Sequence, residues 1–401
     1  MTLTAPDQAT PAGPSVPGKA RRRMRIDLRQ YGILAALAII IILFQILTNG
    51  RLLYPGNVSN LIQQNAYVLI LAIGMVIVII AGHIDLSVGS IVAVVGAVAA
   101  LSMQSWGLPW WGAIILALVV GAVIGAWQGF WIAFVGIPAF IVTLAGMLIF
   151  RGLALVLLTG GTISGLPPQF NAIGSGTIPT TGAPDLITFG IAAVASLALI
   201  VQQVRTRATL RRLELPRERA VSAWIKVGIA VAAIMYVAYL LAYNRGTPII
   251  LIILAALILI YSFVLNRTVF GRHVYAMGGN LFAAQMSGVK TKWVTFFIFV
   301  NMGLLAGLAG VVSTARAGSA VASAGGSFEL DAIAAVFIGG AAVQGGVGTV
   351  IGAVIGGLVM GVLNQGLSIL SVDAAWQQVI KGLVLLFAVA FDVLSKRRSG
   401  R

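Results

Sequence analysis

The feature that most constrains this chain is a succession of long apolar runs without charged residues. One of them, AYVLILAIGMVIVIIAG, covers residues 66–82. The whole chain is 59% hydrophobic and only 9% charged, whereas about 25% of the residues in a soluble domain carry a charge. Continuous apolar runs favour membrane-spanning helices, because the strands of a membrane barrel alternate apolar and polar residues. We therefore predict an all-α fold, a polytopic helical bundle in a membrane.

Twelve apolar segments are candidates for crossing the bilayer. They are residues 31–48, 66–82, 87–104, 110–134, 138–158, 185–201, 225–243, 248–265, 294–315, 331–344, 347–364 and 376–394. The segment 331–344 is short for a hydrocarbon layer of about 30 Å, so it is either a tilted span or a half-crossing helix. The expected number of spans is therefore ten to twelve. The stretch NVSNLIQQN at 57–65 is expected to lie along the membrane surface, and 31–48 is expected to be a retained signal anchor.

The basic residues gather in a few places that predict the orientation. Of 26 lysines and arginines, 21 fall in residues 1–30, 202–226, 266–292 and 396–401, and none falls in the loop 159–184. Basic loops stay on the cytoplasmic side of a membrane protein. With twelve crossings, both termini are then cytoplasmic and the loop 159–184 is external. This distribution accounts for the net charge of +16 without a nucleic-acid partner.

Three regions follow from this pattern. The Ala-Pro-Gly-rich residues 1–30 are expected to be a disordered cytoplasmic tail, residues 31–395 a transmembrane domain, and residues 396–401 a basic tail. Within the domain, the glycine patterns of 112–125 and 348–361 match each other in helices that would run in opposite directions. Such inverted repeats are typical of transporters.

Several polar residues interrupt the apolar runs and are candidates for a translocation pathway or a gate. A charge at the bilayer centre costs about 2.5–3.5 kcal/mol on insertion scales, so it usually has a function or a partner. The candidates are Asp85, Ser87, Arg151, Gln344 and Asn364. Asp85 and Ser87 also fit the cap of the following helix, and Gln344 and Asn364 also fit hydrogen bonds between helices. Both interpretations remain open.

Three further charged residues are candidates for docking on the outer face. Arg316 ends one span, and Glu329 and Asp331 flank the short segment that follows. No phosphate-binding loop, HExxH or GxSxG motif is present, and neither a nucleophile–base pair nor a metal site is indicated by spacing. The chain is therefore expected to have no catalytic residues, no metal and no bound cofactor.

A short helix in a cytoplasmic loop suggests a contact with a partner protein. The residues concerned are Asn280, Leu281, Phe282, Ala283, Ala284, Gln285, Met286, Ser287 and Gly288. They are too few to cross a bilayer, yet they include an apolar face. A helix of this kind fits a groove on another protein.

Four blocks of sequence resemble the permease subunits of bacterial ABC sugar importers. They are FGRHVYAMGGNLFAAQMSGVK (270–290), AGHIDLSVGSIVAVVGA (81–97), FIVTLAGMLIFRG (140–152) and ELDAIAAVFIGGAAVQGGVGTVIGA (329–353). The resemblance covers nearly the whole chain from residue 31 and is closest to the xylose and multiple-monosaccharide permeases of the ribose-type family. The family's loop pattern E-A-A-x-x-x-G is matched at Ala283, Ala284 and Gly288, whereas Phe282 replaces the glutamate.

The resemblance implies a mechanism and a set of partners. Residues 280–288 would be the coupling helix, bound to an ATPase subunit that uses ATP and Mg²⁺. A periplasmic sugar-binding protein would deliver a monosaccharide to the outer face, and a second permease copy would complete the pathway in the inner membrane. The additional helix pair at 186–246 is shared with the xylose-type branch and is expected to pack peripherally among membrane lipid.

Two other functions remain as alternatives. An ion-coupled secondary transporter would account for the repeat and for Asp85 and Arg151, but it would leave residues 280–288 unexplained. A membrane enzyme acting on lipid-linked substrates would need catalytic carboxylates, for which only Asp85, Glu329 and Asp331 are available.

Overall fold

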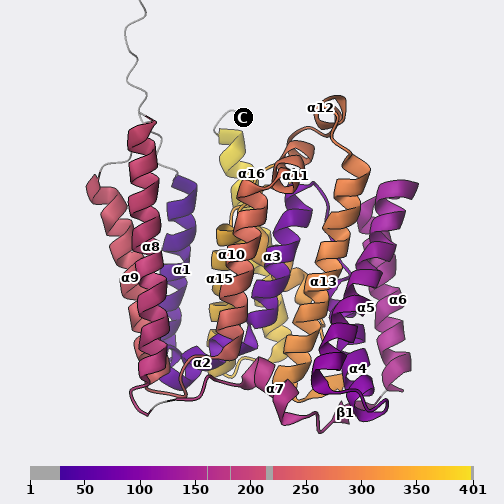
Figure 1. Cartoon of the computed structure of the whole chain (residues 1–401), viewed down its shortest axis with the longest axis horizontal. Helices are drawn as coiled ribbons and strands as arrows, with labels where there is room; N and C mark the ends of the chain where they lie inside the picture. Colours follow the sequence, from indigo (N-terminus) through magenta and orange to yellow (C-terminus); the bar gives the residue numbers. More distant parts are fainter. Residues whose placement is uncertain (1–27, 160, 181, 214–219, 399–401) are drawn as a thin grey trace, which may run out of the picture.

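The computed structural model shows a bundle of long helices that run side by side (Figure 1). It describes residues 28–159, 161–180, 182–213 and 220–398. The two ends of the bundle are named here by an element found at each. The α12 edge is at the top of Figure 1 and the β1 edge is at the bottom.

The elements follow the order expected from the apolar runs, with short pieces at both edges. The helices are α1 (Leu28–Leu47), a 3-10 turn (Arg51–Leu53), α2 (Pro55–Gln64), α3 (Ala66–Ile80), α4 (Val88–Gln104), α5 (Trp110–Phe130) with a π-helical end (Trp131–Val135), α6 (Ala139–Leu158), α7 (Pro168–Ser175), α8 (Leu186–Arg212), α9 (Ala220–Ala242), α10 (Ile249–Arg267), α11 (Val269–Gly279), α12 (Leu281–Met286), α13 (Thr291–Ala317), α14 (Phe328–Ile338), α15 (Val350–Ile369) and α16 (Ala374–Arg398). The two strands, β1 (Thr162–Ser164) and β2 (Ser319–Val321), pair antiparallel.

Among the described residues, seven helices are long and apolar enough to cross a membrane. They are α5, α6, α8, α9, α10, α13 and α15. Shorter apolar helices lie in α1, α4 and α16, and α2 and α3 form a bent pair with an angle of 42°. The bent pair is a broken span or a re-entrant loop, so the surface position of residues 57–65 stays a prediction.

The helix expected at 331–344 is shorter and begins earlier. In the structure α14 has 11 residues, which corresponds to about 16 Å and is too short for a full span. Its end is set by Gly339, where a side chain would meet the Gly352 carbonyl oxygen at 2.2 Å, and by Gly340, whose φ is 86°. The chain then continues without a helix to Thr349. Of the two alternatives expected for 331–344, the structure has the half-crossing helix, and a non-helical segment with turns, residues 339–349, follows it.

Small residues allow the central helices to pack backbone to backbone. A Cβ at Gly121 of α5 would lie 2.5 Å from the Gly303 carbonyl oxygen, and one at Gly125 would lie 2.3 Å from that of Phe299. Both partners belong to α13. In the same way, Gly356 of α15 lies against α14, where a Cβ would be 1.9 Å from the Ala335 oxygen. Helices in lipid associate through such close van der Waals contact.

The two ends of the described chain lie at the same edge. The helix α1 begins and α16 ends at the α12 edge (Figure 1), as an even number of crossings requires. The tail expected at 1–30 lies outside the described residues up to position 27, as do residues 214–219 of the arginine-rich loop and the last three residues. The helices α5 and α15 run in opposite directions, which an inverted repeat requires but does not establish, so the repeat stays a prediction.

Candidate functional site

The short helix α12 stands at one edge of the bundle (Figure 1) and is stabilised by local hydrogen bonds. The Asn280 side-chain oxygen accepts a hydrogen bond from the Ala283 N–H at 2.9 Å, which caps the start of the helix. At its end, the Ser287 hydroxyl donates to the Ala283 carbonyl at 2.9 Å. Gly288 adopts a φ of 81°, and the Val289 N–H bonds to the Ala284 carbonyl at 3.1 Å. These are the start and stop features of an independent helical turn.

The side chains of α12 divide into one buried residue and an exposed apolar group. Ala284 is 4% exposed and anchors the helix. Leu281, Phe282 and Met286 are 50%, 71% and 74% exposed, respectively, and Gln285 is also exposed and donates weakly to Thr291 at 3.4 Å. Large apolar side chains at the tip of a short projecting helix favour a contact with another protein.

The preceding helix α11 joins α12 to two breaks in the bundle. A side chain at Gly278 would lie 1.6 Å from the Ile80 carbonyl oxygen, so the backbones of α11 and α3 touch at this point. The same Ile80 oxygen accepts a hydrogen bond from the Gly346 N–H at 2.8 Å. The Tyr275 hydroxyl donates to the Gly348 carbonyl at 2.7 Å. The helix α11 therefore contacts both the end of α3 and the non-helical segment 339–349 after α14.

Asp85 and Ser87 lie in the break between α3 and α4. One oxygen of Asp85 accepts hydrogen bonds from the Ser87 N–H at 2.9 Å and from its hydroxyl at 2.6 Å. The Gln128 amide of α5 in turn donates to the Ser87 hydroxyl at 2.7 Å. Asp85 is 1% exposed. These bonds form a buried polar turn just before α4, whose first residue is Val88, and they favour a structural role over that of a group lining an open pathway.

Arg151 of α6 holds the segment between β2 and α14. Its guanidinium donates to the carbonyl oxygens of Ala322 at 2.9 Å and Ala324 at 2.7 Å. From its position in α6, Arg151 lies about 10 Å from the β1 edge of that helix. Arg151 and Glu329 are both partly exposed, and one carboxylate oxygen of Glu329 is buried against Gly89 without a hydrogen-bond partner. Two charged side chains, Arg151 and Glu329, are thus partly exposed at a depth where contact with lipid tails is unfavourable for a charge.

Asp331 lies in the interior and not on the outer face, contrary to the expectation of a docking residue. It is 2% exposed and forms an ion pair with Lys381 of α16 at 3.2 Å. It also accepts a hydrogen bond from the Tyr67 hydroxyl at 3.0 Å, and the Tyr67 ring stacks on Phe328. Neither Lys381 nor Tyr67 was among the residues predicted from the sequence, although a single lysine in the apolar run of α16 is a signal for a buried partner.

Of the other two docking candidates, Glu329 lies against Gly89 of α4, and Arg316 is at the β1 edge and does not join Asp331. Its guanidinium donates to the Asn60 side-chain oxygen at 3.3 Å. A cavity of about 190 Å³ lies beside it, lined in part by Gln63, Gln64 and Ser313. Its walls offer both hydrogen-bond donors and acceptors.

The last two pathway candidates have different surroundings. Asn364 is 7% exposed, and its amide donates to the Asn65 side-chain oxygen at 3.1 Å, which is a link between helices. Gln344 is exposed in a turn of the non-helical segment 339–349. Among the described residues, no group of three or more His, Cys, Asp or Glu residues could hold a metal ion.

The comparisons with known proteins agree with a transport function. Residues 57–389 match the family described as the permease component of branched-chain amino acid transport systems. The chain is 39% identical to the xylose transport system permease of Haemophilus influenzae over 373 residues, which are 93% of this chain and 98% of that protein.

Ribose permeases are also similar. The identity to the ribose import permease of Bacillus subtilis is 35% over 376 residues, with 93% of this chain and 96% of that protein covered. No solved structure matches this chain. The chain therefore belongs to the family of permease components that includes these xylose and ribose transport proteins.

Proposed function

We propose that this chain is the membrane permease subunit of an ABC importer that carries a monosaccharide into the cytoplasm, with xylose as the favoured substrate. The observation that carries the proposal is the 39% identity to xylose permeases over 93% of the chain. ATP and Mg²⁺ would be used by a separate ATPase subunit, and this chain would bind neither.

The geometry of α12 supports an ATPase contact at that edge. A projecting helix with exposed Phe282 and Met286 offers a compact apolar surface, and its link through α11 to the bundle can pass a rigid-body motion to the spans. The basic residues of the α8–α9 loop and of both termini favour a cytoplasmic α12 edge and an inner-membrane location. A periplasmic binding protein would then dock at the β1 edge, for which Arg316 remains a candidate.

The partial exposure of Arg151 and Glu329 supports a water-filled pathway beside the β2–α14 segment. Charged groups at that depth face water or protein and avoid lipid. A second copy of the chain packed against this face would enclose the pathway, and alternating access would move the sugar past it. Gln344 follows the same segment and remains a pathway candidate. The hydrogen bonds of Asp85, Ser87 and Asn364 favour structural roles.

The experiment measures uptake of labelled xylose into proteoliposomes that contain this chain and its ATPase subunit. The binding protein is supplied on the side from which xylose is taken up. We expect uptake to require ATP. The double variant F282S/M286S should lose both uptake and ATPase binding while the chain keeps its stability. The control V269S alters another exposed apolar residue of this edge, 55% exposed, and should retain both.

Two results would contradict the proposal. If uptake of xylose proceeds without ATP and follows an ion gradient, the chain is a secondary transporter. If F282S/M286S transports and binds the ATPase as the wild type does, α12 is not the coupling contact.

A further inference from the structure

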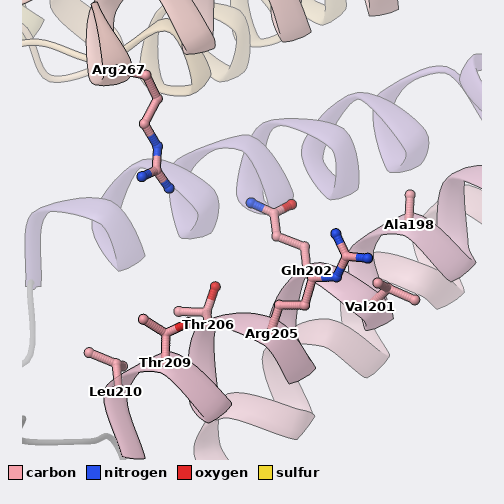
Figure 2. Close-up of a pocket in the computed structure, with 8 residues that line it drawn as sticks. All are labelled: Ala198, Val201, Gln202, Arg205, Thr206, Thr209, Leu210 and Arg267. Carbon is pink, nitrogen blue, oxygen red and sulfur yellow. The ribbon is translucent and has the colours of Figure 1, made fainter. Parts of the chain in front are cut away.

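A groove of about 540 Å³ opens between the last turns of α8 and the end of α10. Its polar lining consists of Gln202, Arg205, Thr206 and Thr209 from α8 and Arg267 from α10. In Figure 2, Arg267 extends from one wall toward the polar side chains of α8, and the ribbon of α1 passes between them in this view. The groove is far from α12, from the Arg151 segment and from the cavity beside Arg316.

The two arginines lie at the depth where phospholipid headgroups begin. The starts of α8 and α10 are tied together at the β1 edge, because the hydroxyls of Thr188 and Thr247 are 2.9 Å apart. Arg205 is about 28 Å along α8 from its first residue, and Arg267 is about 27 Å along α10. The hydrocarbon core of a bilayer is about 30 Å thick. Both guanidinium groups therefore lie near the polar boundary at the α12 edge.

The protein itself leaves this groove open to lipid. In the most apolar windows of α8 and α9, 17% and 22% of the residues are buried, against 78% for α15. The walls below the arginines are apolar, with Ala198 and Val201 lining the groove and Leu197 further down at 60% exposure. Acyl chains fit such walls, because empty space beside apolar side chains forfeits their van der Waals contacts.

The charge of the groove selects the kind of headgroup. Among the described residues that line the groove, none is acidic. Within the part of the chain that the structure describes, neither Arg205 nor Arg267 has a hydrogen bond or an ion pair from its guanidinium group, and both are exposed. Arginine binds phosphate through two parallel N–H donors, and the neighbouring threonine hydroxyls add further donors. A zwitterionic headgroup would bring its own cation to these charges, whereas an anionic headgroup leaves a net negative charge.

We propose that this groove binds the headgroup phosphate of an anionic phospholipid, with Arg205 and Arg267 donating to the headgroup from two helices and the acyl chains lying along the apolar face of α8. The lipid joins the α8–α9 pair to the bundle at the α12 edge. The assignment to the cytoplasmic leaflet rests on the orientation proposed above, but headgroup binding does not. Basic pockets between membrane helices are known to bind anionic lipid in this way.

Native mass spectrometry of the purified full chain tests the proposal. Dioleoyl phosphatidylglycerol and dioleoyl phosphatidylcholine have the same acyl chains, so the two lipids differ only in the headgroup. We expect the wild type to retain phosphatidylglycerol in preference. The double variant R205Q/R267Q should lose roughly 30-fold in apparent affinity for it, since each arginine near a headgroup contributes about a factor of five or more.

A matched control separates a defined site from general attraction. The variant R211Q/R212Q removes two positive charges as well, but from the last turn of α8, outside the groove. It should keep the preference for phosphatidylglycerol. The variant R205K/R267K should recover part of it. Thermal unfolding of each variant in detergent, monitored by circular dichroism, confirms that the fold is retained.

Three outcomes would overturn the proposal. The first is a wild type without preference between the two lipids. The second is an equal loss in R211Q/R212Q, which would show that only net charge matters. The third is displacement of the lipid by millimolar inorganic phosphate, which would identify a site for a soluble phosphate.

Discussion

The buried ion pair between Asp331 and Lys381 gives a measurable test of how α14 is held in the bundle. The substitution Lys381→Met keeps most of the length of the side chain but removes the ammonium group 3.2 Å from the carboxylate. The Asp331 side chain is only 3% exposed and the Lys381 side chain 23%. Removing one partner of such a pair costs about 3–5 kcal/mol, because the other charge stays buried without compensation.

The structure narrows this range. The Tyr67 hydroxyl still donates to Asp331 in the variant, and a hydrogen bond to a charged group contributes about 1.5–3 kcal/mol. We therefore expect a loss near 3 kcal/mol. The double variant K381M/D331L should recover most of it, since an apolar pair of similar volume needs no desolvation of charge.

Equilibrium unfolding of the purified chain in mixed micelles measures both values, and a double-mutant cycle isolates the coupling between the two residues. The control K292M removes an exposed lysine and should change the free energy of unfolding by less than about 0.5 kcal/mol. A K381M variant within 1 kcal/mol of the wild type, or a double variant no more stable than the single one, would show that the pair does not stabilise α14.

Two further substitutions test the neighbouring contacts. Gly278→Ala places a Cβ 1.6 Å from the Ile80 carbonyl oxygen, so we expect it to lower the unfolding temperature and the uptake rate. The control Gly279→Ala meets no atom within 4 Å and should change neither. Equal effects of the two variants would refute the contact between α11 and α3. Arg151→Gln removes the donors to two carbonyls of the β2–α14 segment. We expect uptake to fall at least tenfold while ATPase binding remains. Unchanged uptake would exclude a role of this segment in the pathway.

The long helices could be predicted because each apolar run is longer than a soluble core helix requires. The short helix α12 could also be predicted, because Asn280 and Gly288 are recognisable signals of its start and stop. The end of α14 could not. Glycine is common inside membrane helices, so Gly339 and Gly340 in an apolar run give no warning. Only the contact with Gly352 of a distant helix shows why the helix stops there.

The internal polar contacts were harder to predict from the sequence for a related reason. Arg151 was recognised as a group that needs a partner, but its partners are the backbone carbonyls of Ala322 and Ala324, which carry no signal in the sequence. Asp331 was placed at the outer end of a span because the predicted helix began there. In the structure the helix begins at Phe328, and the carboxylate turns inward to Lys381. An error of a few residues in a helix boundary was sufficient to reverse the assignment.

The contacts of α11 indicate how a movement of α12 could reach the pathway. One non-helical segment, between α3 and α4, begins after Ile80, and another, between α14 and α15, contacts the Ile80 carbonyl through Gly346. That oxygen accepts a hydrogen bond from Gly346 and lies against Gly278 of α11. Backbone contacts of this kind have no flexible side chain that could absorb a displacement. Because closely packed contacts switch between discrete arrangements and do not deform continuously, a shift of α11 should move the start of α4 and the end of α14 together. The segment that Arg151 holds precedes α14, so the 11 residues of α14, together with residues 339–349 and α11, connect the proposed pathway to the proposed ATPase contact.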